Sequence, residues 1–66
     1  MTLGDLFDVI LGTWKVRLQC DETDLDFIAF SNDPIFEPYL NRTVRFIQKG
    51  VQILKSVHYE INITII

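Results

Sequence analysis

The sequence predicts a small α+β domain in which an N-terminal helix packs on an antiparallel sheet. Apolar residues recur at helical spacing over residues 3–10, and apolar and polar residues alternate over residues 14–20. A longer alternation, rich in isoleucine, covers residues 51–65. The predicted order is helix, strand, strand, short helix, strand, strand, with one hairpin joining the first two strands and another joining the last two, in an order across the sheet that the sequence leaves open.

The first predicted element is a helix from Thr2 to about Leu11. Thr2 can cap it, and Asp5, three residues on, completes a capping box that also suits the positive end of the helix dipole. Gly12 is placed to end it in a left-handed conformation. The apolar stripe that we expect to face the sheet contains Leu3, Leu6, Phe7 and Ile10.

Two predicted strands follow, at residues 14–20 and 25–30, joined by a polar turn at residues 21–24. The buried side of the first strand is predicted to hold Trp14, Val16, Leu18 and Cys20. The second strand is apolar on both sides, because Phe27 and Ala29 alternate with Ile28 and Phe30. It is therefore either a central strand covered twice, or a strand whose Ile28 and Phe30 form an interface.

A short helix and a third strand are predicted next. Asp33 and Pro34 are suited to the N-cap and first helical position, and Pro38 limits the helix over residues 34–40 to a turn or two. The side chains expected to point inward from it are Ile35, Phe36, Tyr39 and Leu40. Residues 42–48 form the third predicted strand, and Lys49 and Gly50 form a tight turn after it.

The terminal stretch, residues 51–65, is too long for a domain of this size if it is one straight strand. Fully extended, it would span about 50 Å at roughly 3.3 Å per residue. A compact chain of 66 residues has a radius of gyration of about 11 Å. The strand must therefore bend, where the alternation lapses at Lys55 and Ser56, or project into a partner.

The composition favours one domain, residues 1–66, that associates with a second copy. One cysteine and one histidine exclude an intrachain disulfide and a Cys/His zinc site, and we expect no cofactor. The chain has 48% hydrophobic residues and neither a disulfide nor a zinc site to stabilise it. It therefore has more apolar surface than a domain of this size buries alone. The predicted homo-oligomer interface contains Ile28, Phe30, Tyr59, Ile61, Ile63 and Ile65.

The net charge of −3 weighs against nucleic acid and acidic membrane surfaces as partners. The basic residues Lys15, Arg17, Arg42 and Arg45 would form a stripe only if the first and third strands are close. The chain has no secretory signal pattern, and no apolar stretch approaches the roughly 18 residues of a membrane span. With its free cysteine, we expect a cytoplasmic protein.

No set of residues predicts an enzyme or a metal site. The acidic residues Asp21, Glu22, Asp24 and Asp26 lack the spacing of a calcium loop and are typical of a solvated turn. His58 and Glu60 could in principle do acid–base work, but no nucleophile or second histidine completes a site. An exposed pair on one strand is the simpler interpretation, and Cys20 is most simply a small core residue.

The chain resembles small proteins encoded by phages and prophages of Gram-positive gut bacteria. The resemblance rests on residues 2–10 (TLGDLFDVI), residues 15–18 (KVRL), residues 38–44 (PYLNRTV) and the isoleucine-rich end. It implies a small α+β fold with no known catalytic residues. We therefore expect a non-enzymatic interaction module that binds a protein, itself included. The alternative is an inhibitor of a host nuclease or defence complex that uses the acidic loop as a phosphate mimic.

Overall fold

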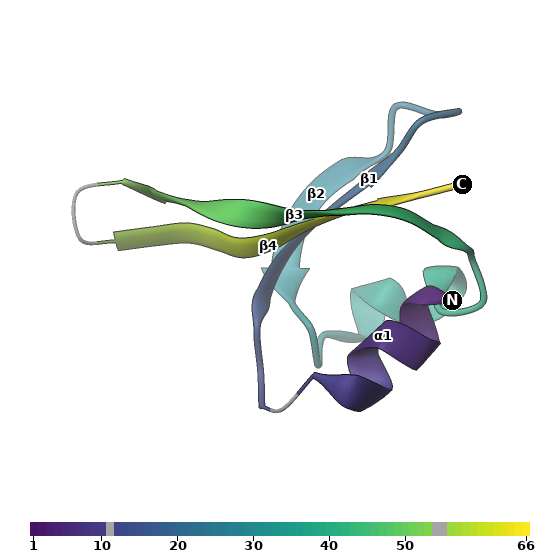
Figure 1. The fold of residues 1–66 in the computed structure, drawn as a ribbon, viewed down its shortest axis with the longest axis horizontal. Helices are drawn as coiled ribbons and strands as arrows, with labels where there is room; N and C mark the ends of the chain where they lie inside the picture. The colour runs from purple at the N-terminus through teal and green to yellow at the C-terminus, as the bar shows by residue number, and fades with distance from the viewer. Residues whose placement is uncertain (11, 54–55) are drawn as a thin grey trace.

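Two parallel strands, β1 (Lys15–Cys20) and β4 (Ser56–Ile65), form the centre of a four-stranded sheet. The computed structural model describes residues 1–10, 12–53 and 56–66. β2 (Asp26–Phe30) lies outside β1 and β3 (Val44–Ile53) lies outside β4, each antiparallel to its neighbour (Figure 1). The α+β class, the element order and both hairpins are confirmed. The sheet is mixed, however, and the expectation of a purely antiparallel sheet is wrong for its central pair.

The connection between the hairpins explains the parallel pair. β3 runs in the same direction as β2, so the chain that leaves β2 must return along the sheet before β3 can begin. Residues 31–43 make this crossover and contain η1, a 3₁₀ helix at Pro34–Tyr39. Alternation predicts which face of a strand is buried but not the direction of a distant neighbour, which is why the sequence left this orientation undetermined.

The helix α1 (Leu3–Val9) has the predicted capping box. Thr2 Oγ1 accepts a hydrogen bond from Asp5 N, and Asp5 Oδ2 accepts one from Thr2 N, both at 3.1 Å. The hydrogen bond from the Thr2 backbone lowers the pKa of the Asp5 carboxyl. The helix ends at Val9, earlier than predicted, and Leu11 lies outside the described residues.

The first turn of α1 is also bound to the end of the crossover. Leu3 N donates to Arg42 O at 2.9 Å and Gly4 N donates to Leu40 O at 2.8 Å. These are two of the N–H groups that a helix leaves without an internal partner. A Cβ on Gly4 would lie 3.1 Å from Leu40 O, so this close approach favours glycine.

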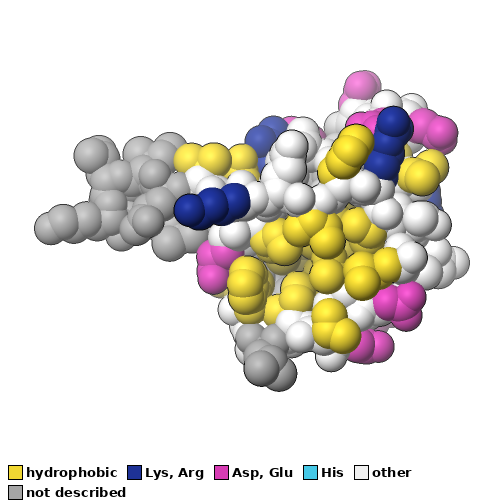
Figure 2. Space-filling view, in the orientation of Figure 1, with side chains coloured by type: hydrophobic (Ala, Val, Ile, Leu, Met, Phe, Trp, Pro, Cys, Tyr) yellow, Lys and Arg dark blue, Asp and Glu magenta, His cyan; other side chains and the backbone are white. Residues whose placement is uncertain are grey.

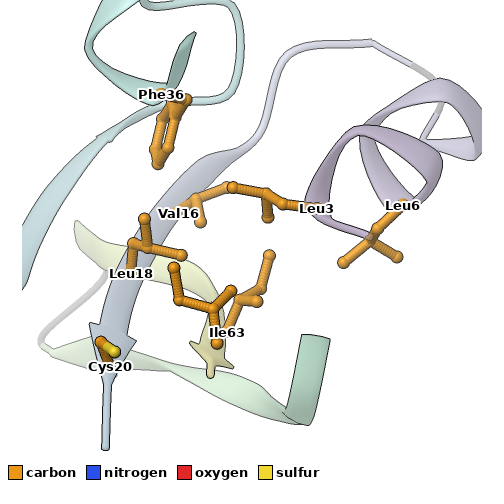
Figure 3. Close-up of a cluster of buried hydrophobic side chains, with 8 residues drawn as sticks. Leu3, Leu6, Val16, Leu18, Cys20, Phe36 and Ile63 are labelled. Carbon is orange, nitrogen blue, oxygen red and sulfur yellow. The ribbon is translucent and has the colours of Figure 1, made fainter. Parts of the chain in front are cut away.

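The core lies between the sheet and the two helices, and the predicted stripe of α1 contributes to it (Figure 3). Leu3, Val16, Leu18, Ile63 and Ile65 have no exposed surface. Phe7, Ile10, Trp14 and Ile61 pack against them while partly buried. The predicted burial of Val16, Leu18 and Cys20 on one face of β1 is confirmed.

The crossover helix η1 begins as predicted, because Asp33 Oδ1 accepts a hydrogen bond from Ile35 N at 2.9 Å and Pro34 follows the cap. Phe36 is buried in the core, and its ring lies 5.2 Å from that of Phe7 and 5.3 Å from that of Phe27. The expectation that Ile35 points inward is wrong, since it is 47% exposed.

Gly50 lies inside β3, so the predicted turn at Lys49 and Gly50 is wrong. A Cβ on Gly50 would collide with Tyr59 O on the neighbouring strand, and Glu60 O would be 2.6 Å away. The glycine is therefore there because two backbones approach closely, and not because the chain turns. Among the described glycines, the one with positive φ is Gly12, at 85°.

The terminal stretch is two strands and not one. Residues 51–53 end β3, the chain reverses between Ile53 and Ser56, and β4 returns to Ile65. The lapse in the alternation therefore marks a hairpin; Leu54 and Lys55 lie outside the described residues. This reversal fits the stretch into a molecule whose longest dimension is 33 Å. The end of β3 and the start of β4 project beyond the other strands (Figure 1).

We predict that Ile63→Ala lowers the free energy of unfolding by about 2–5 kcal/mol, because Ile63 is fully buried. Its ladder partner Ile47 is 49% exposed and provides a matched control. Ile47→Ala should cost under about 1 kcal/mol in the isolated chain. Urea unfolding at low protein concentration measures both, and equal losses would contradict this placement of the core.

We predict that Gly50→Ala lowers the free energy of unfolding by about 1–3 kcal/mol, because β3 or β4 must shift to make room for a methyl group. The control is Lys49→Ala at the exposed neighbouring position, which should cost under about 0.5 kcal/mol. A thermal or urea denaturation series on the two variants checks this. A turn at this position would tolerate alanine far better than a closely paired strand.

Candidate interaction surface

The helical layer covers three of the four strands. η1 lies over β2, where Phe27 contacts Phe36 and Tyr39 with ring centroids 5.3 and 6.0 Å apart. α1 packs over the central strands, whose inward side chains share one core cluster with Leu3 and Leu6. On β3, Val44 at the start of the strand packs against this core, whereas Ile47 further along it is 49% exposed. This part of the sheet therefore has the weakest cover.

Exposed apolar side chains follow this uncovered margin. Ile47 of β3 is 49% exposed although Ile63, directly opposite it in the ladder, is completely buried. Val9 of α1 and Met1 are also largely exposed, and Met1 O accepts a hydrogen bond from Val44 N at the start of β3. Figure 2 shows a broad apolar area between β3 and α1. We call this apolar area between β3 and α1, which Ile47 borders on the inner face of β3, the apolar strip (Figure 2).

The edge of β3 is paired with the N-terminal residues at its start, where Val44 N donates to Met1 O, and beyond that point it carries features that oppose pairing with another strand. Arg45 and Lys49 are exposed along it, and the register shifts between Val44 and Phe46 and again between Val51 and Gln52. Charged side chains and bulges are the usual means by which edge strands avoid further pairing. A partner molecule can therefore cover the strip more readily by packing against the face of β3 than by adding a strand to the edge of β3.

The opposite face of the sheet is polar in the middle. Arg17 lies between Ile28 and Asn62 in the ladder and binds Asp26 through two hydrogen bonds of 2.7 and 2.9 Å. Its guanidinium carbon also lies 5.5 Å from the centre of the Tyr59 ring. The hydrogen bond to Asp26 raises the pKa of Arg17 and lowers that of Asp26. This cation is thus held by its own chain.

Asn62 is buried within this polar centre. Its Nδ2 donates to Gln48 Oε1 at 3.3 Å, while Oδ1 has no hydrogen-bond partner among the described residues. Asn62 pairs with Arg17 on one side and with Gln48 on the other, and these long side chains flank it. The arrangement forms a polar row across the sheet and not an apolar contact surface.

Four of the six predicted interface residues belong to the core or to the body of the sheet. Ile63 and Ile65 are fully buried, Tyr59 is 7% exposed, and Ile61 packs against the core. They are covered because β4 is a central strand, paired on both sides, and not a free end of the sheet. Placing the interface on these four is therefore wrong for the folded chain.

The other two predicted interface residues remain within reach of a partner. Ile28 is partly buried and Phe30 is 54% exposed, both on the uncovered face of β2. The alternative of a central β2 covered on both faces is wrong, because β2 is an edge strand with only its inner face packed.

The acidic loop is partly neutralised by the chain itself. Asp21 forms an ion pair with Arg45 at 2.6 Å, and Asp26 forms one with Arg17. Glu22 and Asp24 are exposed. Two paired acids of four make this loop a weaker mimic of a phosphate backbone than the sequence implies.

The predicted basic stripe does not form. β4 separates β1 from β3, so Lys15 and Arg17 lie apart from the basic residues near β3. Arg42 Nε donates to Ile66 O at 2.7 Å and Arg45 binds Asp21. Arg17, Arg42 and Arg45 are thus each held by groups of the same chain.

The residues considered for chemistry serve local contacts. The Glu60 carboxylate accepts a hydrogen bond from Lys15 N at 3.1 Å, and the His58 ring lies 5.5 Å from that of Tyr59. Cys20 is buried as predicted; a hydrogen bond from the Glu22 backbone lowers the pKa of its thiol. Within the described ranges, no three His, Cys, Asp or Glu side chains gather in a group suited to a metal ion.

Comparison with protein-family models, curated proteins and solved structures found no match to this chain. The resemblance to small phage and prophage proteins therefore stays a prediction. None of the helices formed by residues 1–10, 12–53 and 56–66 is long and apolar enough to cross a membrane.

The apolar strip was not predicted from the sequence. Ile47 lies within the predicted third strand, but alternation does not tell which strand forms the edge of the sheet. One signal was present: Phe46 and Ile47 are adjacent apolar residues in a strand, so at least one of them must lie on a face that the helices leave open.

We predict that the ion pair between Arg17 and Asp26 contributes to acid sensitivity. The folded-state pKa of Asp26 is lowered, so its contribution is present above the unfolded-state pKa, near 3.8, and is lost as the pH falls through the lower folded-state value. Asp26→Asn should therefore lower the melting temperature at neutral pH and leave it nearly unchanged at about pH 2. Asp24→Asn, in the same loop and without a described ion pair, is the control. A constant difference across the pH series would contradict the prediction.

Proposed function

We propose that this chain is a non-enzymatic protein-interaction module that binds through the apolar strip between α1 and β3. The observation that carries the proposal is the contrast within one ladder pair: Ile63 is completely buried while Ile47, opposite it, is half exposed. An apolar area that spans two structural elements is a typical mark of a protein contact site. Val9 of α1 and Met1 are further apolar side chains that are largely exposed.

The charged residues support a binding role over a catalytic one. Arg17 and Arg45 are each paired with a carboxylate of the chain, and the Glu60 carboxylate accepts a backbone hydrogen bond. A catalytic group must instead be left available to a substrate. The origin in a phage or mobile element is part of the proposal and rests on the sequence resemblance alone. The acidic-loop inhibitor is less favoured, because Asp21 and Asp26 are already in ion pairs.

The test compares two exposed isoleucines of nearly equal accessibility. Ile47, on the strip, is 49% exposed, and Ile35, on η1, is 47% exposed. Ile47→Asp should abolish both self-association, measured by analytical ultracentrifugation, and capture of partners from a cell lysate. Ile35→Asp should change neither, and circular dichroism should show that both variants fold. Loss of binding in Ile35→Asp, or full binding in Ile47→Asp, would refute the strip as the contact surface.

A further inference from the structure

A hollow of about 240 Å³ lies between α1 and η1, whereas the apolar strip lies between α1 and β3. The two helices lie on the same face of the sheet (Figure 1). The apolar lining of the hollow includes Phe7, Phe36 and Leu40. Phe36 is almost completely buried, and Phe7 and Leu40 are partly buried against the core. The hollow therefore has a floor of core side chains.

The charged residues that line this hollow are all acidic. They are Asp8 of α1, Asp33 and Glu37, and no Lys or Arg lines the hollow with them. Asp8 and Glu37 are exposed, and neither forms an ion pair or a side-chain hydrogen bond within the described ranges. Asp33 uses Oδ1 to cap η1. The hollow thus presents negative charge that the chain itself does not neutralise.

Contacts between the two helices explain the place of Asp8. Gly4 N donates to Leu40 O at 2.8 Å, and the ring of Phe7 lies 5.2 Å from that of Phe36. Later residues of α1 thus meet earlier residues of η1, so the two helices run in opposite directions. Asp8, which follows Phe7, therefore lies towards the start of η1.

The acids of η1 lie at the same end of the hollow. Residues three apart eclipse each other in a 3₁₀ helix, so Pro34 and Glu37 share one side of η1, and both line the hollow. Asp33 immediately precedes that side, at the N-cap. Acidic residues of α1 and η1 thus border one opening from two directions.

We propose that this hollow receives an arginine side chain of a partner protein. Its volume is below the roughly 300–1,000 Å³ of pockets that hold whole small molecules, so it suits a single side chain. An acidic rim over an apolar floor is complementary to arginine, whose guanidinium is cationic, weakly hydrated and able to stack on an aromatic ring. Carboxylates on two elements can accept its N–H groups from two sides. The site is separate from the apolar strip and goes beyond the proposed function.

A titration with short peptides tests the proposal. Two-dimensional ¹H–¹⁵N NMR spectra of the chain are recorded with acetyl-Gly-Arg-Gly-amide. The matched control is the same peptide with citrulline, which has nearly the shape of arginine but no charge. The arginine peptide should give saturable shifts of the backbone amides of Phe7, Asp8 and Glu37, and the citrulline peptide should bind about tenfold more weakly.

Two substitutions of the chain remove charge while keeping the shape of the side chain. Asp8→Asn and Glu37→Gln should each weaken binding of the arginine peptide about threefold, and the variant with both changes about tenfold. Asp24→Asn removes an exposed acid that does not line the hollow, and it should leave binding unchanged. The spectra of the unbound variants show whether each keeps the fold. Added salt should weaken binding of the arginine peptide to the unchanged chain.

The outcomes separate this inference from the proposed function. Equal binding of the arginine and citrulline peptides, or equal losses in Asp24→Asn and Glu37→Gln, would overturn the site. A peptide with lysine in place of arginine that bound as tightly would overturn the choice of arginine. The absence of a saturable shift with the arginine peptide at millimolar concentrations would also overturn the inference. It would leave the proposed function intact, because the comparison of Ile47→Asp with Ile35→Asp tests the strip by itself.

Discussion

The parallel pairing of β1 with β4 is the constraint on which the rest of the molecule depends. Because the two central strands run the same way, the chain that leaves β2 must travel back along the sheet before β3 can begin. The crossover carries η1 over β2, where Phe36 meets Phe27. α1 then fills the space over β1 and β4. On β3, Val44 still packs against this core but Ile47 is half exposed, so the uncovered strip follows from the topology and not from one unusual residue.

Residues of the same crossover also form hydrogen bonds with both the first helix and the last residue, Ile66. The carbonyls of Leu40 and Arg42 accept hydrogen bonds from the first turn of α1. One residue further on, Thr43 O accepts a hydrogen bond from Ile66 N, and the Arg42 side chain donates to Ile66 O. A domain of 66 residues buries a smaller fraction of its surface than a larger one, and this chain has no disulfide to compensate. Holding two otherwise frayed ends on one loop reduces the number of ways in which the structure can open.

Local signals predicted what depends on neighbouring residues and missed what depends on distant ones. The capping box of Thr2 and Asp5, the Asp33 cap and the buried face of β1 were all predicted correctly, because each is decided within a few residues. The relative orientation of β1 and β4 depends on residues more than forty positions apart, and alternation carries no information about it.

The role of Gly50 was predicted wrongly because glycine is suited both to turns and to close backbone contacts. Only the position of Tyr59 on the neighbouring strand decides between the two. The interface was misplaced onto β4 for the same reason: apolar alternation marks burial but does not say whether the cover comes from the same chain.

If the proposed function holds, folding and binding depend on opposite members of the same ladder and are therefore separable. Ile63 and Ile65 are covered by α1 within one chain, so their burial stabilises the fold whether or not a partner is present. Ile47 stands one strand further out and is half exposed, so the exposed half of its side chain would gain stability only through contact with another molecule. Lys49 and the register shifts of β3 oppose strand addition at the edge but leave the face of the strand accessible. These features disfavour repeated addition of strands to β3, which would extend the sheet without limit. They leave the face of β3 accessible to a contact that involves two faces and then stops.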